Sequence, residues 1–384
     1  MIFNISEGFG RKVKKIISTI LVLIIASMAL FSCGENTDNS GEQSLESNTE
    51  ESKVETLDEK YAKILAFDTY HEMRVVKKGG YYNISYVYDN GAEYQTQLTR
   101  KRWGTYILGA YRYKDENGKT LTFVTDSTDC ENVYNCGLSA GNTTFRGGNH
   151  GDYGVGGTDM NDDTKVNDRF TDLTFYDAKT KNPLTLEEGK VCTAQGLYVV
   201  EHTRIYEGEY KEENIIMEME RQYIFNGEDI FLECNIDVVH DTYFYTSYST
   251  MFPISKAYGN MAKFYNQDGT EKTVQTPLVG KSNFGSNFSD NNDALKVEIW
   301  GEKNPQYHFI IEIYSAEQMQ IKSQFKTRLW DMSPSQNKLY FSMFRTNAPT
   351  VIKAGTHWDT LARWSFSLQP DFVNPDEVDQ KLGF

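Results

Sequence analysis

Residues 214–239 read NIIMEMERQYIFNGEDIFLECNIDVV, and this stretch decides the fold. In its second half, apolar residues such as Ile230, Leu232 and Cys234 alternate with polar ones, which is the two-residue period of a strand with one buried face. The first half alternates in the same way. The turn Asn226-Gly227-Glu228 between the halves is typical of a tight hairpin. The stretch therefore predicts two antiparallel neighbours that share one apolar face.

The rest of the chain follows the same strand pattern. Short runs rich in aromatic and β-branched residues recur between turn signals, and a helical pattern is confined to residues 57–65 and 316–325. We therefore predict an all-β fold, a large antiparallel β-sandwich with few short helices. Besides the hairpin, the expected strands are 81–88, 94–99, 106–113, 120–125, 196–206, 295–300, 307–314, 338–345 and 363–368.

Polar side chains share the second face of three of these strands. If the strands pair in order, one surface carries His202, Arg204, Glu218, Glu220, Gln222, Glu233, Asn235 and Asp237. One interpretation is the ordinary solvated face of an antiparallel sheet. The other is a cleft that binds or processes sugar, because acids, bases and amides occur there together with tyrosines. In that interpretation His202 and Arg204 are candidate catalytic residues, and Glu218, Glu220, Glu233 and Asn235 are candidate ligands.

A glycine-rich loop is expected at residues 137–168. It sets Arg146, Asn149, His150, Asp152 and Tyr153 between glycines that permit close approach of the backbone to a ligand. An acid two residues after the histidine can orient that ring for proton transfer. We therefore take His150 and Tyr153 as candidate catalytic residues and the other three as candidate ligands. An exposed loop with incidental polar residues is the alternative.

The same loop contains an incomplete calcium motif. Asp159, Asn161 and Asp163 have the spacing that opens an EF-hand loop, but Thr164 replaces the glycine and Phe170 replaces the bidentate glutamate. We predict no metal and no cofactor. A loop calcium site of another kind and solvated turn acids remain as alternatives.

Four cysteines remain in the folded part of the chain: Cys130, Cys136, Cys192 and Cys234. An even number in an exported protein suggests two disulfides, for which three pairings exist. Cys130 and Cys136 flank a turn-rich segment and form the natural local pair, which leaves Cys192 for Cys234. Buried free thiols are the alternative.

The N-terminus has the order of an export signal. Basic residues at 11–15 precede an apolar run at 16–31, which is short for a membrane span. The run ends Leu30-Phe31-Ser32-Cys33, which resembles the lipobox of bacterial lipoproteins, although Phe31 is larger than the usual residue. This resemblance implies a signal peptide at 1–32, acylation of Cys33, and a protein anchored by lipid in the bacterial cell envelope, at the outer membrane or cell surface. Residues 33–56 are acidic and polar and are expected to form a disordered tether to a β-sandwich domain at 57–384.

Charge excludes one class of partner. The chain has a net charge of −15, and nucleic-acid binding requires a basic surface, so we expect no nucleic-acid partner. The sequence also lacks the P-loop, GxSxG, HExxH and dinucleotide motifs.

Residues 70–368 resemble the supersandwich β-proteins, which include galactose-mutarotase-like proteins and several polysaccharide lyases. The resemblance lies in the glycine-rich Arg146–Asp152 loop ahead of the antiparallel series, in Lys353-Ala354-Gly355-Thr356-His357-Trp358, and in Trp364-Ser365-Phe366. It implies a supersandwich-like fold and a glycan ligand. In lyases of this kind a Tyr or His removes a proton next to a uronate carboxylate, which Arg, Asn or His neutralises. The negative net charge opposes a polyanion, so neutral glycans fit better.

Two functions from different classes therefore remain. The first is a membrane-anchored lipoprotein that binds carbohydrate, and as an enzyme of lyase or mutarotase type processes it, at a loop-covered polar sheet face. The second is a non-catalytic adhesin or assembly lipoprotein that contacts another protein through its tyrosine-rich surfaces. Whether the protein is an enzyme is open at this point.

Overall fold

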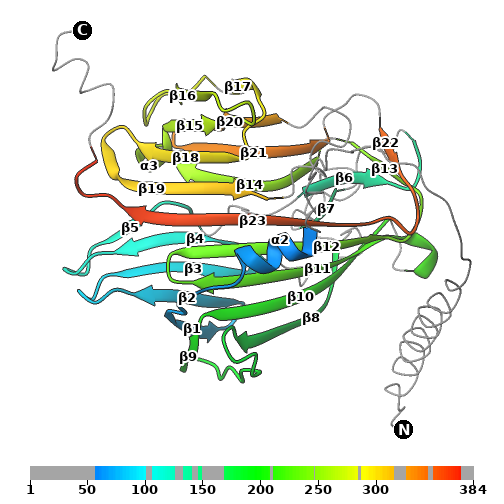
Figure 1. Ribbon diagram of the computed structural model, residues 1–384, viewed down its shortest axis with the longest axis horizontal. Helices are drawn as coiled ribbons and strands as arrows, with labels where there is room; N and C mark the ends of the chain where they lie inside the picture. The colour runs from blue at the N-terminus through cyan, green and yellow to red at the C-terminus, as the bar shows by residue number, and fades with distance from the viewer. Residues whose placement is uncertain are drawn as a thin grey trace, which may run out of the picture. The chain divides into compact units, whose positions relative to one another are not determined.

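The computed structural model describes residues 57–100, 106–125, 133–140, 146–148, 168–207, 211–245, 247–283, 287–314, 326–344 and 349–372. All of them belong to one compact unit, Glu55–Phe384. Antiparallel strands in three sheets make up most of this unit, and the described α-helices are two short ones (Figure 1). The predicted all-β antiparallel sandwich is confirmed.

The largest sheet has nine strands and contains the hairpin of residues 214–239. Its order is β16 (Glu271–Gln275), β15 (Met261–Tyr265), β18 (Lys296–Gly301), β19 (Asn304–Ile313), β23 (His357–Leu368), β12 (Asp229–Val238), β11 (Ile215–Asn226), β10 (Leu197–Tyr206) and β8 (Asp168–Asp177).

Two smaller sheets complete the sandwich. The six-stranded sheet has the order β5 (Thr120–Thr122), β4 (Tyr106–Lys114), β3 (Glu93–Arg100), β2 (Tyr81–Val87), β1 (Glu72–Lys78) and β9 (Val191–Gln195). The eight-stranded sheet has the order β17 (Asn287–Asn292), β20 (Lys326–Asp331), β21 (Gln336–Phe344), β14 (Ser247–Ser255), β6 (Val133–Gly137), β13 (Thr242–Phe244) and β22 (Thr350–Ile352), and β7 (Arg146–Gly148) pairs with β6.

Both smaller sheets pack on the same face of the nine-stranded sheet. Phe366 of β23 stacks on Tyr94 of the six-stranded sheet at 4.9 Å between ring centroids. Its cross-strand neighbour Phe309 lies 5.2 Å from Phe252 of the eight-stranded sheet. We call this the inner face and its opposite the outer face. The hairpin residues predicted to point inward are all buried: Ile215, Met217, Met219, Tyr223, Phe225, Ile230, Leu232, Cys234, Ile236 and Val238.

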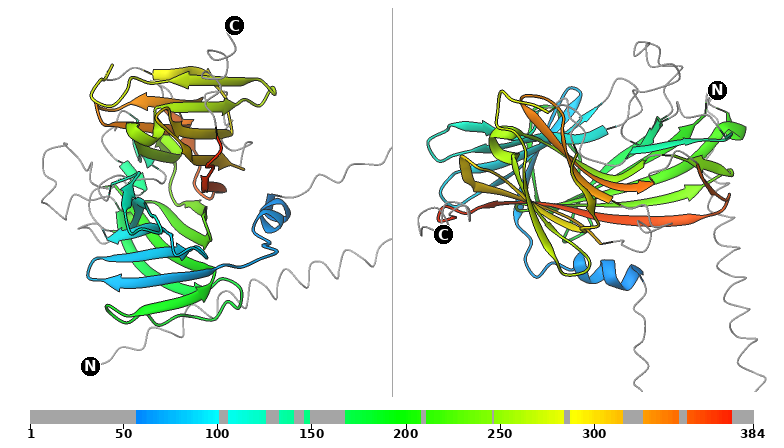
Figure 2. Two further views of the ribbon diagram at one scale, coloured as in Figure 1. Left: turned by 90° about the vertical axis from the view of Figure 1, so that its left-hand side faces the viewer. Right: turned by 90° about the horizontal axis from the view of Figure 1, so that it is seen from above.

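The helix α2 (Leu57–Ile64) covers part of the outer face, on the other side of β23 from the six-stranded sheet (Figure 2). Its Tyr61 is buried in a small apolar cluster with Ile224, Phe231 and Leu361. This helix was predicted at 57–65, whereas the helix predicted at 316–325 lies outside the described residues.

The β11–β12 hairpin also holds the segment that follows α2. Gly227 has a φ of +65°, which a two-residue hairpin loop favours. The buried amide of Asn226 donates to the carbonyl of Thr69 at 3.0 Å and accepts from the backbone N–H of His71 at 2.8 Å. The hairpin turn therefore reverses the chain and also holds residues 69–71 in place.

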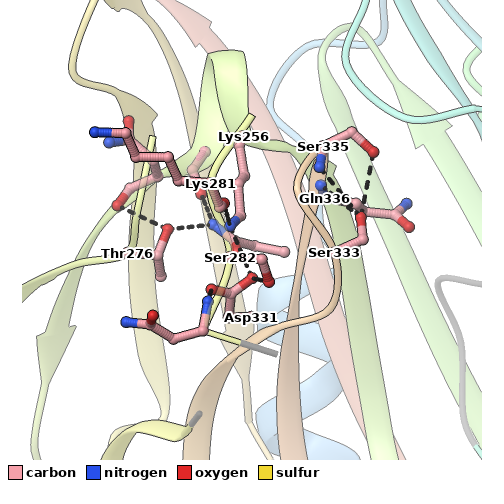
Figure 3. A network of polar contacts seen from close by, with 12 residues as sticks. Lys256, Thr276, Lys281, Ser282, Asp331, Ser333, Ser335 and Gln336 are labelled. Atoms are coloured by element: carbon pink, nitrogen blue, oxygen red, sulfur yellow. Dashed lines mark hydrogen bonds and ion pairs between the residues drawn. The ribbon is translucent and has the colours of Figure 1, made fainter. Parts of the chain in front are cut away.

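A buried ion pair joins the second helix, α3 (Lys256–Gly259), to the eight-stranded sheet. The ammonium of Lys256 lies 2.7 Å from Asp331 and donates to the carbonyl of Lys281 at 2.8 Å (Figure 3). Asp331 also accepts from the hydroxyl of Ser282 at 2.9 Å and from the backbone N–H of Asn283 at 2.8 Å. These bonds satisfy both buried charges, so the network holds residues 281–283 in place.

One disulfide prediction is wrong. Cys192 lies in β9 of the six-stranded sheet opposite Val75, and Cys234 lies in β12 of the nine-stranded sheet opposite Arg221. No disulfide joins these two cysteines, which lie in strands of different sheets. Cys136 of β6 likewise forms no disulfide, so the predicted Cys130–Cys136 bond is not seen either, and Cys130 itself lies outside the described residues.

Candidate functional site

The polar residues of the outer face lie in two cross-strand rows. In the first row His202 is opposite Glu220, which is opposite Asn235. The second row consists of Arg204, Glu218, Asp237 and His357, on β10, β11, β12 and β23 in that order. Because antiparallel pairing places such residues side by side on one face, four strands present one continuous polar surface.

This surface is hollowed into a cleft of about 640 Å³. Seven of the eight polar outward residues expected from the sequence line it, so the expected polar face exists as one site. Their functional roles remain predictions. The cleft is lined by His202, Thr203, Arg204, Glu218, Met219, Glu220, Glu233, Asn235, Asp237 and His357.

His202 is held between two carboxylates. Its Nδ1 lies 2.5 Å from Asp172 of β8 and its Nε2 lies 2.8 Å from Glu220. Burial lowers the pKa of His202, but hydrogen bonds from its two ring nitrogens to Glu220 and Asp172 raise the pKa by more, so the net shift is upward. Both nitrogens are engaged as donors to carboxylates. This geometry fits a charged positioning group better than the proton-transfer role expected from the sequence.

A chain of hydrogen bonds continues from this histidine through Glu220 to Gln222 and Tyr198, which lie beside the cleft on the same face of the sheet. Gln222 donates to Glu220 at 2.5 Å and accepts from the hydroxyl of Tyr198 at 2.7 Å. Burial raises the pKa of Glu220, but hydrogen bonds from His202 and Gln222 lower this pKa by more. The net shift is downward, so Glu220 stays ionised. Burial, with the charges of Glu220 and Glu233, raises the pKa of Tyr198 to about 12. These polar side chains are therefore fixed in orientation before any ligand arrives.

The second row ends in a histidine that was not among the predicted site residues. Nδ1 of His357 lies 2.8 Å from Asp237, and both side chains are more than half exposed. At the other end of the row, Arg204 lies 2.8 Å from Glu218 and 3.6 Å from Glu212. The Asp237 contact fixes the orientation of the His357 ring, so His357 is the better placed of the two histidines in the cleft for proton transfer.

The predicted loop residues are only partly described. Arg146 begins β7, which pairs with β6, and Tyr134 of β6 packs against Trp358 on the inner side of the nine-stranded sheet. The described part of the loop thus belongs to the eight-stranded sheet. Asn149, His150, Asp152 and Tyr153 lie outside the described residues, so a contact between them and the cleft stays a prediction.

The calcium alternative is likewise not tested by the structure. Asp159, Asn161 and Asp163 lie outside the described residues. Within the described part of the chain, no group of three or more His, Cys, Asp or Glu side chains is arranged to hold a metal ion.

Comparisons with known proteins give a fold-level similarity. No family model matches the sequence, and no curated protein does. Among solved structures, the galactosidase domain of the alpha-galactosidase–sucrose kinase AgaSK has a TM-score of 0.44 and 9% identity over 77% of this chain and 42% of that chain. A galactose mutarotase-like protein from Clostridium acetobutylicum has a TM-score of 0.41 and 8% identity over 79% of this chain and 100% of that one.

The GH36 alpha-galactosidase AgaB from Geobacillus stearothermophilus has a TM-score of 0.39 and 10% identity over 77% of this chain and 40% of that one. This chain therefore spans less than half the length of both galactosidase chains. Fold and cleft together define the class: an antiparallel β-sandwich protein with a charged, open cleft on the outer face of its largest sheet.

Proposed function

We propose that the outer-face cleft binds carbohydrate. The observation that carries this proposal is the composition of its lining, in which each row contains both hydrogen-bond donors and hydrogen-bond acceptors. Arg204 stands beside Glu218, and the amide of Asn235 stands beside Glu220. A sugar hydroxyl donates one hydrogen bond and accepts others, so the hydroxyls of a sugar ring suit a lining that offers both.

The size and fixed geometry of the cleft support the same ligand class. A volume of about 640 Å³ lies within the range of pockets that hold small organic ligands. The Tyr198–Gln222–Glu220 chain holds its members in place without a ligand. Its bond to the carboxylate of Glu220 is of the strong kind, because hydrogen bonds to charged groups are stronger than those between neutral groups. A ligand that contacts Glu220, the member of this chain that lines the cleft, would therefore cause little loss of side-chain freedom there.

Binding is tested by applying the purified full chain to an array of oligosaccharides and measuring the affinity of each hit by calorimetry. We expect a defined glycan class to bind wild type and to bind the Asp237→Asn variant more weakly. The matched control is Glu271→Gln, which removes one charge on β16, far along the sheet order from the cleft. An equal loss in both variants would contradict binding at the cleft.

We further propose that the protein is an exported lipoprotein attached through Cys33. The support is sequence alone: basic residues, an apolar run and Leu30-Phe31-Ser32-Cys33 follow in the order of a lipoprotein signal. No helix among the described residues is long and apolar enough to cross a membrane. Acyl chains on Cys33 would supply the attachment.

A further inference from the structure

Carboxylates outnumber bases in the cleft. Four carboxylates line it, those of Glu218, Glu220, Glu233 and Asp237. Two more, outside the lining, contact its bases: Asp172 on His202 and Glu212 on Arg204. The bases of the lining are Arg204, His202 and His357, and each of the two histidines is charged only when protonated. The cleft therefore carries a net negative charge.

Each of these three bases already contacts at least one carboxylate of the protein. His202 has a carboxylate at each ring nitrogen, Arg204 contacts Glu218 and Glu212, and His357 contacts Asp237. An anionic ligand would have to displace one of these internal partners. The cleft is thus poorly suited to a uronate or a sulfated sugar.

The centre of the second row places two acids directly opposite each other. Glu218 of β11 pairs with Asp237 of β12, and their cationic partners Arg204 and His357 lie at the two ends of the row. Directly opposed side chains have Cβ atoms about 5 Å apart, and like charges at that distance repel. A cation above the middle of the row would relieve this repulsion.

We infer that the ligand of the cleft is an amino sugar, a glycan whose protonated amine lies over Glu218 and Asp237. This inference rests on the proposed carbohydrate binding and adds the charge of the sugar. The net charge of −15 acts in the same direction, because the field of the protein attracts a cation at long range. The remaining hydroxyls of the sugar would bond to the donors and acceptors of the first row.

The test compares three oligosaccharides of equal length by calorimetry with the full chain, at a pH at which the amine is protonated. The first is an oligomer of glucosamine, the second its N-acetylated, neutral form, and the third an oligogalacturonate. We expect the glucosamine oligomer to bind at least about tenfold more tightly than the neutral form, the size of one charge-assisted contact. The oligogalacturonate is expected to bind more weakly than both.

Variants distinguish an effect of the cleft carboxylates from an effect of the overall charge of the protein. Glu218→Gln and Asp237→Asn are expected to remove most of the preference for the amine, whereas Glu271→Gln, which loses the same charge on β16, is expected to retain it. Both cleft residues are substantially exposed, so the variants should remain folded. Thermal unfolding checks this for each variant.

Three results would overturn the inference. Equal affinity for the glucosamine and N-acetylated oligomers would show that the charge is irrelevant, while leaving carbohydrate binding intact. An oligolysine of the same charge that binds as tightly as the glucosamine oligomer would show that the cleft takes any cation. Failure of all glycans to bind would remove the proposed function itself, and the inference with it.

Discussion

Glu201 and Arg221 form a fully buried ion pair on the inner face of the sheet, with Oε2 and Nη1 3.5 Å apart. They pair across β10 and β11, and each is adjacent in sequence to a cleft residue, His202 or Glu220. The backbone N–H of Tyr106 donates to Glu201 at 2.8 Å, and Arg221 donates to the hydroxyl of Thr203 at 3.1 Å. The two strands that carry His202 and Glu220 are therefore joined by an ion pair on their inner side as well.

We predict that Arg221→Met destabilises the fold by about 3–5 kcal/mol, because it leaves the carboxylate of Glu201 buried without its counter-charge. The double variant Glu201→Gln/Arg221→Met should recover part of this loss. Denaturant unfolding of the two single variants and the double variant measures the coupling. Additive losses would contradict a direct pairing of the two charges.

Burial raises the pKa of Glu201 to about 6, although Arg221 opposes this shift. The folded state then binds a proton more readily than the unfolded state, so the contribution of this group to stability falls as pH rises from about 4.5 to 6. Replacement by Gln should flatten the dependence of unfolding free energy on pH in that window. An unchanged slope would contradict the upward shift.

His202 is a base whose pKa is also raised, so its effect on stability falls in a higher pH range than that of Glu201. Its pKa is raised in the folded state by Asp172 and Glu220, against the effect of burial. The stabilisation is complete below the ordinary histidine pKa of about 6.5 and is lost as pH rises through the higher folded value. We predict that His202→Gln removes this loss, which thermal unfolding between pH 5 and about 9 would reveal. A wild-type melting temperature that does not fall in this range relative to His202→Gln would contradict the assignment.

Gly227 combines a turn conformation with a close neighbour. Its φ is +65°, and a Cβ added there would lie 3.1 Å from the ring of His71. We predict that Gly227→Ala costs about 1 kcal/mol or more of unfolding free energy. The control is Gly91→Ala, where φ is +82° and nothing lies within 4 Å of the added carbon. A loss no larger than the control's would show that the His71 contact is unimportant.

Anchoring is tested at one residue. We predict that Cys33→Ala leaves the thermal unfolding of the folded unit unchanged and releases the protein from the membrane fraction, because Cys33 precedes the unit Glu55–Phe384 in the sequence. Cell fractionation with immunodetection is the measurement. Continued membrane association of the variant would contradict the lipid anchor.

The strands that were predicted well are those with clear alternation. In β11 and β12 large apolar residues occupy nearly every inner position, so the parity of the sequence already separates core from cleft. Arg221 interrupts this pattern, and its partner Glu201 has inner parity on β10. The pairing of these two residues could have been found from the register of the strands.

Features that the sequence did not predict correctly are those with a weak or absent sequence pattern. β23 begins at His357, six residues before the strand predicted at 363. The first half of this strand was not predicted because its inner residues Thr360 and Ala362 are small and lower the apolar contrast. His357 therefore stayed outside the predicted site. Asp172 lies in β8, which no strand prediction covered. The Cys192–Cys234 pairing failed because elimination among cysteines contains no information about which sheet each strand joins.

We propose that the row Arg204, Glu218, Asp237 and His357 binds a sugar. Calorimetric titration of an array-selected glycan into wild type, Asp237→Asn and Glu271→Gln, with thermal unfolding of each, tests this directly. We expect an affinity at least about tenfold weaker for Asp237→Asn, wild-type affinity for Glu271→Gln, and closely similar unfolding temperatures for all three. Wild-type affinity in Asp237→Asn, measured with the same glycan, would contradict it.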